Sequence, residues 1–321
     1  MVQTRSGRAR STSYVQWLVL FACLFLLTTV ALLWFGSECS CAVSSSSTSD
    51  AVLSSEKQNT LAILILSSAR NHDRRQAIRD SWLQFIPLQL SNLTNQVVYK
   101  FVIGVSHLDP SPEKDVLVLQ NAKDDYFSLT DKLLDALQWF SQHVKADYLL
   151  KVDDDSFVNL PTLLSELFSL RWGAPRMLYV GFMDGRATVK TKGKWSEPEW
   201  KLCDRYLPYA KGGGYILSYD LIHFLAKNSF YLKRYRSEDV SVGAWLAGLA
   251  VTYVHDQRFD TEYVSRGCLN DYLITHKKTP ADMAQLFDQL NRTGTLCSEE
   301  VTLRNSYEYN WNVPPSQCCE R

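Results

Sequence analysis

The stretch Tyr148-Leu-Leu-Lys-Val-Asp-Asp-Asp-Ser-Phe-Val158 runs from a short, mostly apolar segment directly into three consecutive carboxylates. Residues 148–152 have the length and polar boundaries of a buried strand. The three acids then fall where a strand of an open α/β sheet emerges, and ligands bind at such carboxyl ends. The stretch therefore predicts a polar ligand site at one edge of a sheet.

The side chains of the acidic triplet are expected to divide between two faces. The alternation of an extended backbone places Asp153 and Asp155 on one side and Asp154 on the other. Two carboxylates on one side repel each other unless a cation, a shared proton or open water intervenes. A hard divalent ion such as Mg²⁺ or Mn²⁺ is the usual partner, especially where it also holds phosphates. The alternative is a solvated acidic turn that caps a helix beginning near Pro161.

Strand-like and helix-like segments alternate along the chain from about residue 60 onward. This order predicts an α/β fold with a mostly parallel central sheet. The strands are expected at residues 61–66, 97–105, 115–119, 148–152 and 177–182, and the helices at residues 129–144, 161–170 and 220–226.

Basic residues follow the first expected strand. Arg70, Arg75 and Arg79 accompany Ile78 and Trp82, which stand four residues apart as on a helix face. Arginines grouped after the first strand of an α/β domain suggest an anion site, with diphosphate as the natural ligand. The alternative is a solvated helix face with charge pairs along it.

Two glycine-containing segments are expected near a cleft. Residues 190–200, which include Trp195, are rich in Lys, Gly and Trp and are predicted to form a loop beside it. Gly212, Gly213 and Gly214 precede a β-like run, so they either allow close approach of a ligand to the backbone or form a tight turn.

Further candidate functional groups occur in the C-terminal half. Glu238 and Asp239 follow Ser237 at an expected helix start, where carboxylates cap free amides. The functional interpretation is a general base at the lip of a cleft. His255 and His276 each stand next to a short apolar run, and a neutral imidazole would suit a manganese site, although a lone histidine is more often structural.

The N-terminal region predicts a membrane anchor. Basic residues at positions 5, 8 and 10 precede residues 15–35, an uncharged stretch long enough to cross a bilayer as a helix. A cleaved signal peptide is the alternative. The expected layout is a cytoplasmic tail (1–14), a transmembrane signal anchor (15–35), a Ser-rich luminal stem (36–59) and a folded luminal domain (60–321).

Composition and sequons agree with a luminal domain. The 34 basic and 34 acidic residues balance, which gives no reason to expect a nucleic-acid partner. Asn92 and Asn291 begin glycosylation acceptor sequons. The chain has eight cysteines, and in an oxidising compartment those of the folded part are expected to form disulfides with at least one cysteine left over.

Several motifs together resemble a known family. They are Arg75-x-x-Ile-Arg-x-x-Trp82, Asp125-x-Tyr-x-x-Leu-Thr-x-Lys132, Lys151-Val-Asp-Asp-Asp155, Gly212-Gly-Gly-Tyr215 and Glu238-Asp-Val-x-x-Gly243. In this order they resemble the β-1,3-galactosyltransferase and N-acetylglucosaminyltransferase family of Golgi enzymes, over residues 60–320. The C-terminal passage, with Ser265-Arg-Gly-Cys268 and Pro314-Pro-Ser-Gln-Cys-Cys319, resembles the members that build the proteoglycan linkage region.

The resemblance implies an inverting GT-A-type transferase in the Golgi membrane, with Mn²⁺ as cofactor. The donor would be UDP-galactose, and the acceptor galactosyl-xylose on a proteoglycan core protein. A second candidate is the same fold transferring N-acetylglucosamine or using another acceptor, and a third is a membrane-anchored sugar-binding protein without turnover.

The resemblance also implies roles for individual residues. Asp239 would be the general base, and Asp155 a metal ligand with His276 preferred over His255 as its partner. The donor would lie near Arg70, Arg75, Arg79, Lys132, Asp153 and Asp154, and the substrate cleft near Trp195, Gly212, Gly213, Gly214 and Glu238.

Overall fold

The computed structural model describes residues 59–86, 95–105, 113–169, 171–173 and 175–321. The expected tail, membrane anchor and stem, apart from residue 59, and the sequon at Asn92 lie outside these residues. Within the described ranges, no helix combines the length and apolar character that crossing a membrane requires.

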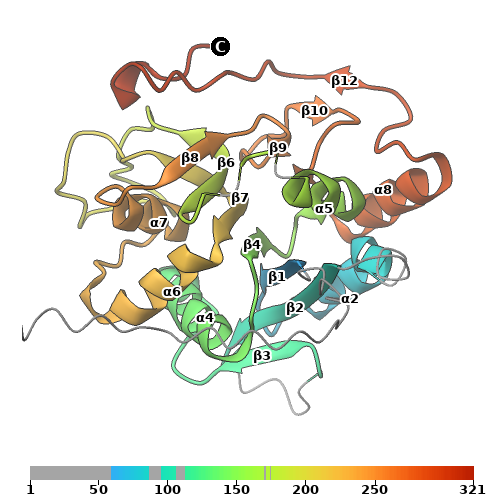
Figure 1. The fold of residues 1–321 in the computed structure, drawn as a ribbon, viewed down its shortest axis with the longest axis horizontal. Helices are drawn as coiled ribbons and strands as arrows, with labels where there is room; N and C mark the ends of the chain where they lie inside the picture. The colour runs from blue at the N-terminus through green and yellow to red at the C-terminus, as the bar shows by residue number, and fades with distance from the viewer. Residues whose placement is uncertain (1–58, 87–94, 106–112, 170, 174) are drawn as a thin grey trace, which may run out of the picture. The chain divides into compact units, whose positions relative to one another are not determined.

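A central sheet of seven strands organises the described domain, in the order β3-β2-β1-β4-β7-β6-β8 (Figure 1). Strands β3, β2, β1 and β4 are parallel, β6 and β8 are parallel, and β7 runs antiparallel to both β4 and β6. The mostly parallel sheet expected from the sequence is thus confirmed. The strands are β1 (Asn59–Leu66), β2 (Asn95–Gly104), β3 (Val116–Leu119), β4 (Tyr148–Asp153), β6 (Leu178–Asp184), β7 (Tyr209–Ser218) and β8 (Thr252–His255).

The two central parallel strands end together. Residues 61–66 of β1 are buried on both faces, which explains their unbroken apolar sequence. Leu66 pairs with Asp153 in the β1–β4 register, and the amide of Asp154 donates to the carbonyl of Leu66 at 3.0 Å. The first residues beyond β1 therefore lie beside the acidic triplet.

Six α-helices pack around the described sheet. Helices α4 and α6 pack against each other, and α2 packs against α8 (Figure 1). Leu133, Leu137 and Phe140 of α4 are buried, as their helical spacing predicts. The helices are α2 (His72–Arg79), α4 (Leu129–His143), α5 (Leu160–Phe168), α6 (Tyr219–Asn228), α7 (Glu238–Leu246) and α8 (Pro280–Thr293).

Helix α8 is absent from the sequence-based assignment although its boundaries are well marked. Thr279 and Asp282 form a capping box at its start, and Gly294 ends it with a φ of 75°. The second sequon, Asn291, lies exposed near the end of this helix.

A small three-stranded sheet brings a late segment of the chain to the acidic triplet. It contains β5 (Phe157–Val158), β11 (Ile274–Thr275) and β9 (Phe259–Asp260). Of the short apolar run before His276, only the two residues of β11 form a strand, and they pair antiparallel with β5, which begins two residues after the triplet. His276 is therefore carried next to the acidic residues.

The C-terminal part contains two disulfides, of which one joins separate segments. Cys268 of β10 (Gly267–Cys268) bonds to Cys297, and β10 pairs with β12 (Val301–Thr302). Cys318 bonds to its neighbour Cys319. Cys203 is exposed and is the free cysteine of the described residues.

Candidate active site

A cavity of about 1110 Å³ lies at the carboxyl ends of β1 and β4 and extends toward β6, β7 and α7. Its lining includes residues from both the parallel half of the sheet and the segments beyond β7. Ten of the residues predicted from sequence line it: Lys132, Asp153, Asp154, Asp155, Trp195, Gly212, Gly213, Glu238, Asp239 and His276.

Asp153, Asp155 and His276 form a cluster, here called the Asp–His triad, whose candidate ligand atoms all lie within 4.8 Å of one another. His276 Nε2 lies 2.9 Å from an oxygen of Asp155 and 3.6 Å from one of Asp153. Lys151 Nζ contacts the other Asp153 oxygen at 2.8 Å, and Lys277 Nζ contacts Asp155 at 3.0 Å. Two carboxylates and one imidazole thus converge on one point of the cavity.

The electrostatics of the triad reflect this crowding. Burial disfavours a charged imidazole, but the nearby carboxylates of Asp153 and Asp155 outweigh it and raise the pKa of His276 to about 9. Burial also opposes ionisation of Asp153, yet Lys151 and His276 hold its pKa below the usual range. In the absence of a metal, the imidazolium neutralises part of the carboxylate charge.

The donor set fits a divalent cation. Although His276 and Asp155 are close, their contact lacks hydrogen-bond geometry. Within the described chain, the two ring nitrogens of His276 and Oδ1 of Asp155 are buried without a hydrogen-bond partner. Such atoms are expected where an ion completes the coordination, and mixed carboxylate and imidazole ligands suit Mn²⁺.

Asp154 points away from the triad, as the alternation of the backbone predicts. Its carboxylate accepts hydrogen bonds from Ser67 Oγ and Asn71 Nδ2, both at 2.8 Å, and from Arg74 at 3.0 Å. Arg74 also lies 3.4 Å from Asp155. Asp154 thus fastens the end of β4 to the segment after β1, and Arg74 is a neighbour of the triad that sequence reasoning missed.

Asp239 lies at the start of α7 on the cavity wall. Its carboxylate accepts from the amides of Gly212 at 3.0 Å and Val240 at 2.9 Å. Burial raises its pKa, while the cations of Lys211 and Lys151 oppose that rise. Each oxygen keeps a free acceptor position in this arrangement, so the group can accept a proton from a hydroxyl in the cavity.

Glu238, the residue before Asp239, is buried and holds a different set of partners. It is paired with Lys151 Nζ and accepts from the hydroxyl of Tyr215 at 2.9 Å. Lys151 also donates to Asp153 at 2.8 Å and to the carbonyl of Gly212 at 2.6 Å. Glu238 is therefore a structural partner that joins α7 to β4. A lysine inside an apolar strand was the sequence signal for this bridge.

The three glycines lie inside β7, which corrects their expected place before a strand and excludes the tight turn, one of the two alternatives. A Cβ on Gly213 would stand 2.6 Å from the ring of His276, and one on Gly214 would stand 2.9 Å from Ile274. A Cβ on Gly212 would meet the carboxylates of Glu238 and Asp239 at 3.2 Å. The absent side chains make room for the protein's own site residues.

The arginines expected at the donor lie elsewhere. Arg75 is buried and donates to the carbonyl of Ser68 at 2.6 Å and to Glu113 at 3.3 Å. Arg79 pairs with Asp115 at 2.9 Å and with Glu113.

Like Arg75 and Arg79, the exposed Arg70 lies outside the described lining of the cavity. Only Lys132 of the predicted donor cations lines it, and its ammonium contacts Asp124 at 2.7 Å.

His255 is separated from the triad by its own hydrogen bonds. Its Nδ1 accepts from the amide of Met183 at 3.0 Å, and its Nε2 donates to the carbonyl of Tyr307 at 2.8 Å. The structure therefore brings His276, and not His255, to the acidic residues.

Sequence reasoning also missed an ion pair on the cavity wall. Lys211 of β7 contacts Asp184 at the end of β6 at 2.6 Å, and its ammonium lies 3.1 Å from the hydroxyl of Tyr209. Basic and acidic residues on adjacent antiparallel strands were the available signal, but their register is visible only in the sheet.

Comparison with known proteins identifies the family of the chain. The family profile described as Galactosyltransferase matches residues 73–257. The chain is 45% identical over 271 residues to beta-1,3-galactosyltransferase 6 of Mus musculus, covering 81% of this chain and 82% of the mouse protein. It is 31% identical over 256 residues to hydroxyproline O-galactosyltransferase GALT6 of Arabidopsis thaliana, covering 74% of this chain but only 36% of the plant protein.

Among solved structures, a glycosyltransferase involved in glycosylation of the major capsid of PBCV-1 matches 72% of this chain and 99% of its own. The identity is 12% and the TM-score 0.38, too low to establish a shared fold. The family profile and the mouse relative decide the assignment: the chain is a glycosyltransferase and belongs to the galactosyltransferase family.

Proposed function

We propose that the protein is a Mn²⁺-dependent, inverting β-1,3-galactosyltransferase of the GT-A type. It would transfer galactose from UDP-galactose to the galactosyl-β-1,4-xylose that links glycosaminoglycans to proteoglycan core proteins. The observation that carries this proposal is one cavity lined both by the Asp–His triad and by Asp239. The similarity to the mouse enzyme supports the choice of sugar and linkage.

The residues of the chain divide the chemistry between them. Asp239 removes the proton from the acceptor hydroxyl as that oxygen attacks the anomeric carbon opposite the diphosphate. Asp155 and His276, with Asp153, would hold Mn²⁺, which when bound supplies positive charge to the departing diphosphate. One base and one stabilised leaving group suffice for a single displacement with inversion.

The nucleotide is proposed to lie over the carboxyl ends of β1 and β4, where Asp154 and Lys132 contribute to the wall. Arg70, Arg75 and Arg79 are not part of this proposal, because the latter two are already paired with acidic residues. The uncharged stretch at residues 15–35 supports a further proposal, a type II membrane anchor with the folded domain in the lumen of the secretory pathway. The Golgi membrane is proposed as its location from the family resemblance alone.

Replacing the base tests the proposal most directly. Asp239→Asn should lower transfer by about 100- to 10,000-fold while UDP still binds in the presence of Mn²⁺. Burial raises the pKa of Asp239, so wild-type kcat/KM should fall as the pH drops through that value and protonates the base. The residual activity of the variant should lack this acid limb. Unchanged turnover in Asp239→Asn would remove this residue from the role of base.

The substrates are tested by supplying several UDP-sugars with a galactosyl-xyloside and analysing the product linkage. UDP-galactose should be used and the product should be β-1,3-linked. A preference for UDP-N-acetylglucosamine would favour the second enzymatic candidate. Binding of saccharide without any product from any donor would favour the sugar-binding candidate instead.

A further inference from the structure

An exposed pair of aromatic rings stands at the cavity. Trp195, from the segment between β6 and β7, and Tyr263, from the segment between β9 and β10, both line it. Their ring centroids are 5.3 Å apart at 73°. Trp195 is 43% exposed and Tyr263 67% exposed. Two large rings are thus left facing solvent beside the catalytic groups, where most aromatic side chains of this domain are buried.

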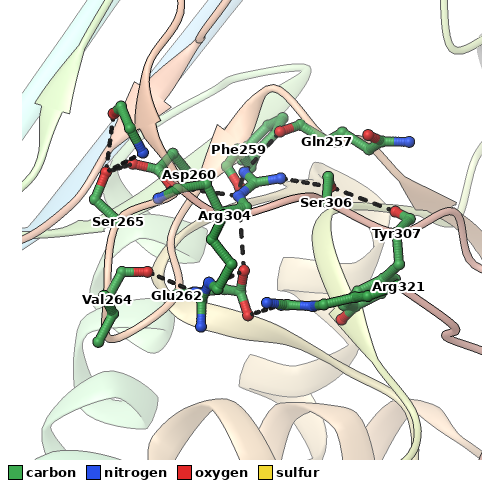
Figure 2. Close-up of polar contacts among 12 residues, drawn as sticks. Gln257, Phe259, Asp260, Glu262, Val264, Ser265, Arg304, Ser306, Tyr307 and Arg321 are labelled. Carbon is green, nitrogen blue, oxygen red and sulfur yellow. Dashed lines mark hydrogen bonds and ion pairs between the residues drawn. The ribbon is translucent and has the colours of Figure 1, made fainter. Parts of the chain in front are cut away.

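The position of Tyr263 is set by charges on its neighbours. Residues 261–264, here called the clamped segment, carry Glu262, whose carboxylate lies 3.1 Å from Arg304 and 3.6 Å from Arg266 and also pairs with Arg321. Arg304 further donates to the carbonyl of Val264 at 2.6 Å. Figure 2 shows Glu262 gathered between Arg304 and Arg321. These contacts hold the segment on both sides of Tyr263.

A buried arginine, Arg266, holds the backbone on either side of the clamped segment. Arg266 donates to the carbonyls of Gln257 at 2.7 Å and Phe259 at 2.8 Å, and to Ser306 Oγ at 2.6 Å. Asp260 accepts a hydrogen bond from the amide of Arg266 at 2.9 Å (Figure 2). The backbone around Tyr263 is therefore fixed before any ligand arrives.

The aromatic pair comes from segments outside the parallel half of the sheet, at whose strand ends the nucleotide is expected. Nucleotides bind at the carboxyl ends of parallel strands, here β1 and β4. In the sheet order, β6 lies beyond β7 from β4, and Trp195 follows β6. Asp239 accepts a hydrogen bond from Gly212 of β7, the strand between β4 and β6. Because the proposed base Asp239 must meet the acceptor hydroxyl, the acceptor is expected in the part of this cavity that the nucleotide leaves free.

We propose that Trp195 and Tyr263 form a platform for the acceptor saccharide, stacking on the C–H face of a pyranose ring, with the clamped segment as its support. This inference rests on the proposed function and adds the place and the residues of acceptor recognition. A pyranose presents one apolar face and a rim of hydroxyls. The exposed rings can contact the apolar face, and charged groups of the cavity such as Arg304 can bind the hydroxyls.

The test is steady-state kinetics of Trp195→Ala and Tyr263→Ala with UDP-galactose and a galactosyl-xyloside. The acceptor KM should rise about three- to tenfold, the range expected for one aromatic contact, while the KM for UDP-galactose and the Mn²⁺ dependence stay unchanged. Tyr263→Phe, which keeps the ring, should retain the wild-type acceptor KM. Tyr231→Ala is the matched control, because Tyr231 is 82% exposed but lies outside the cavity lining.

Saturation-transfer NMR of the galactosyl-xyloside on the same variants, without donor, measures the platform independently of transfer. Lost saturation transfer in Trp195→Ala and Tyr263→Ala supports it even if wild-type protein transfers no galactose, which would count against the proposed function alone. A rise in the donor KM instead of the acceptor KM would assign the rings to the donor and overturn the inference. Unchanged values for both substrates in an active enzyme would overturn it too.

Discussion

Two regions that line the cavity both carry carboxylates and differ in the cations beside them. In the clamped segment, Glu262 lies among guanidinium groups of Arg266, Arg304 and Arg321. In the Asp–His triad, Asp153 and Asp155 face the imidazole of His276. A guanidinium cannot give up its proton in a protein, whereas an imidazole can. Lys151 and Lys277 also contact the triad, but its imidazole can lose its proton and bind a divalent ion, whereas the nitrogens around Glu262 all belong to guanidinium groups.

The comparison shows that acidic residues alone do not identify a metal site. Both regions contain a carboxylate oxygen without a hydrogen bond, Oδ1 of Asp155 and Oε2 of Glu262. Both regions also contain a nitrogen without a hydrogen-bond partner, but the nitrogens of His276 belong to an imidazole that can act as a ligand, whereas Nε of Arg304 belongs to a guanidinium that cannot. The fixed positive charge around Glu262 serves to hold the backbone.

The largest expected effect comes from removing a triad carboxylate. Asp155→Ala should weaken Mn²⁺ binding by more than about 100-fold and abolish transfer. Replacing a residue that only supports a metal ligand costs up to about 100-fold, and removing a ligand should cost more. Titration calorimetry with Mn²⁺ measures this. Glu262→Gln is the matched variant in the clamped segment and should bind Mn²⁺ like wild type. Normal Mn²⁺ affinity in Asp155→Ala would contradict the difference drawn between the two regions.

A smaller effect is expected when the triad is displaced and not truncated. In Gly213→Ala the new Cβ would stand 2.6 Å from the His276 ring, so the ring must move. Loss of ligand orientation should weaken Mn²⁺ binding by about 10- to 100-fold. Gly248→Ala, where an added Cβ meets no atom within 4 Å, is the control. If both variants bind Mn²⁺ equally well, His276 does not need its present position.

The smallest effect is expected outside the cavity. Arg79→Gln removes ion pairs with Glu113 and Asp115 and a contact with the Phe101 ring. Because these groups are partly exposed, the free energy of unfolding should fall by only about 1 kcal/mol. Chemical denaturation measures that change, and the KM for UDP-galactose should not move. A large increase in that KM would restore Arg79 to the donor site.

The local sequence pattern was sufficient to predict structure where a segment's own residues determine its burial and side-chain directions. The buried strand β4 and the opposed directions of Asp153 and Asp154 follow from apolar content and backbone alternation. The choice between His255 and His276 could not be made this way. It depends on Met183 and Tyr307, which occupy both nitrogens of His255 and stand far from it in the sequence.

The sequence-based placement of the arginines after β1 in the donor site is not supported, for a related reason. Arg75 and Arg79 form a basic cluster in the sequence, but Glu113 and Asp115, which directly precede β3, neutralise them. The glycines of β7 were correctly singled out as sites of close approach, but what approaches is His276, more than 60 positions later in the chain. In both cases the deciding partner becomes visible only when the sheet is assembled.

Lys151 has a consequence for how the proposed metal site and the proposed base are held relative to each other. Its single ammonium binds Asp153 of the triad and Glu238, the residue before Asp239. Moving β4 relative to α7 would break a buried ion pair, at a cost of about 3–5 kcal/mol for an uncompensated charge. One buried ammonium therefore fixes the position of a proposed metal ligand relative to the start of the helix that carries the proposed base.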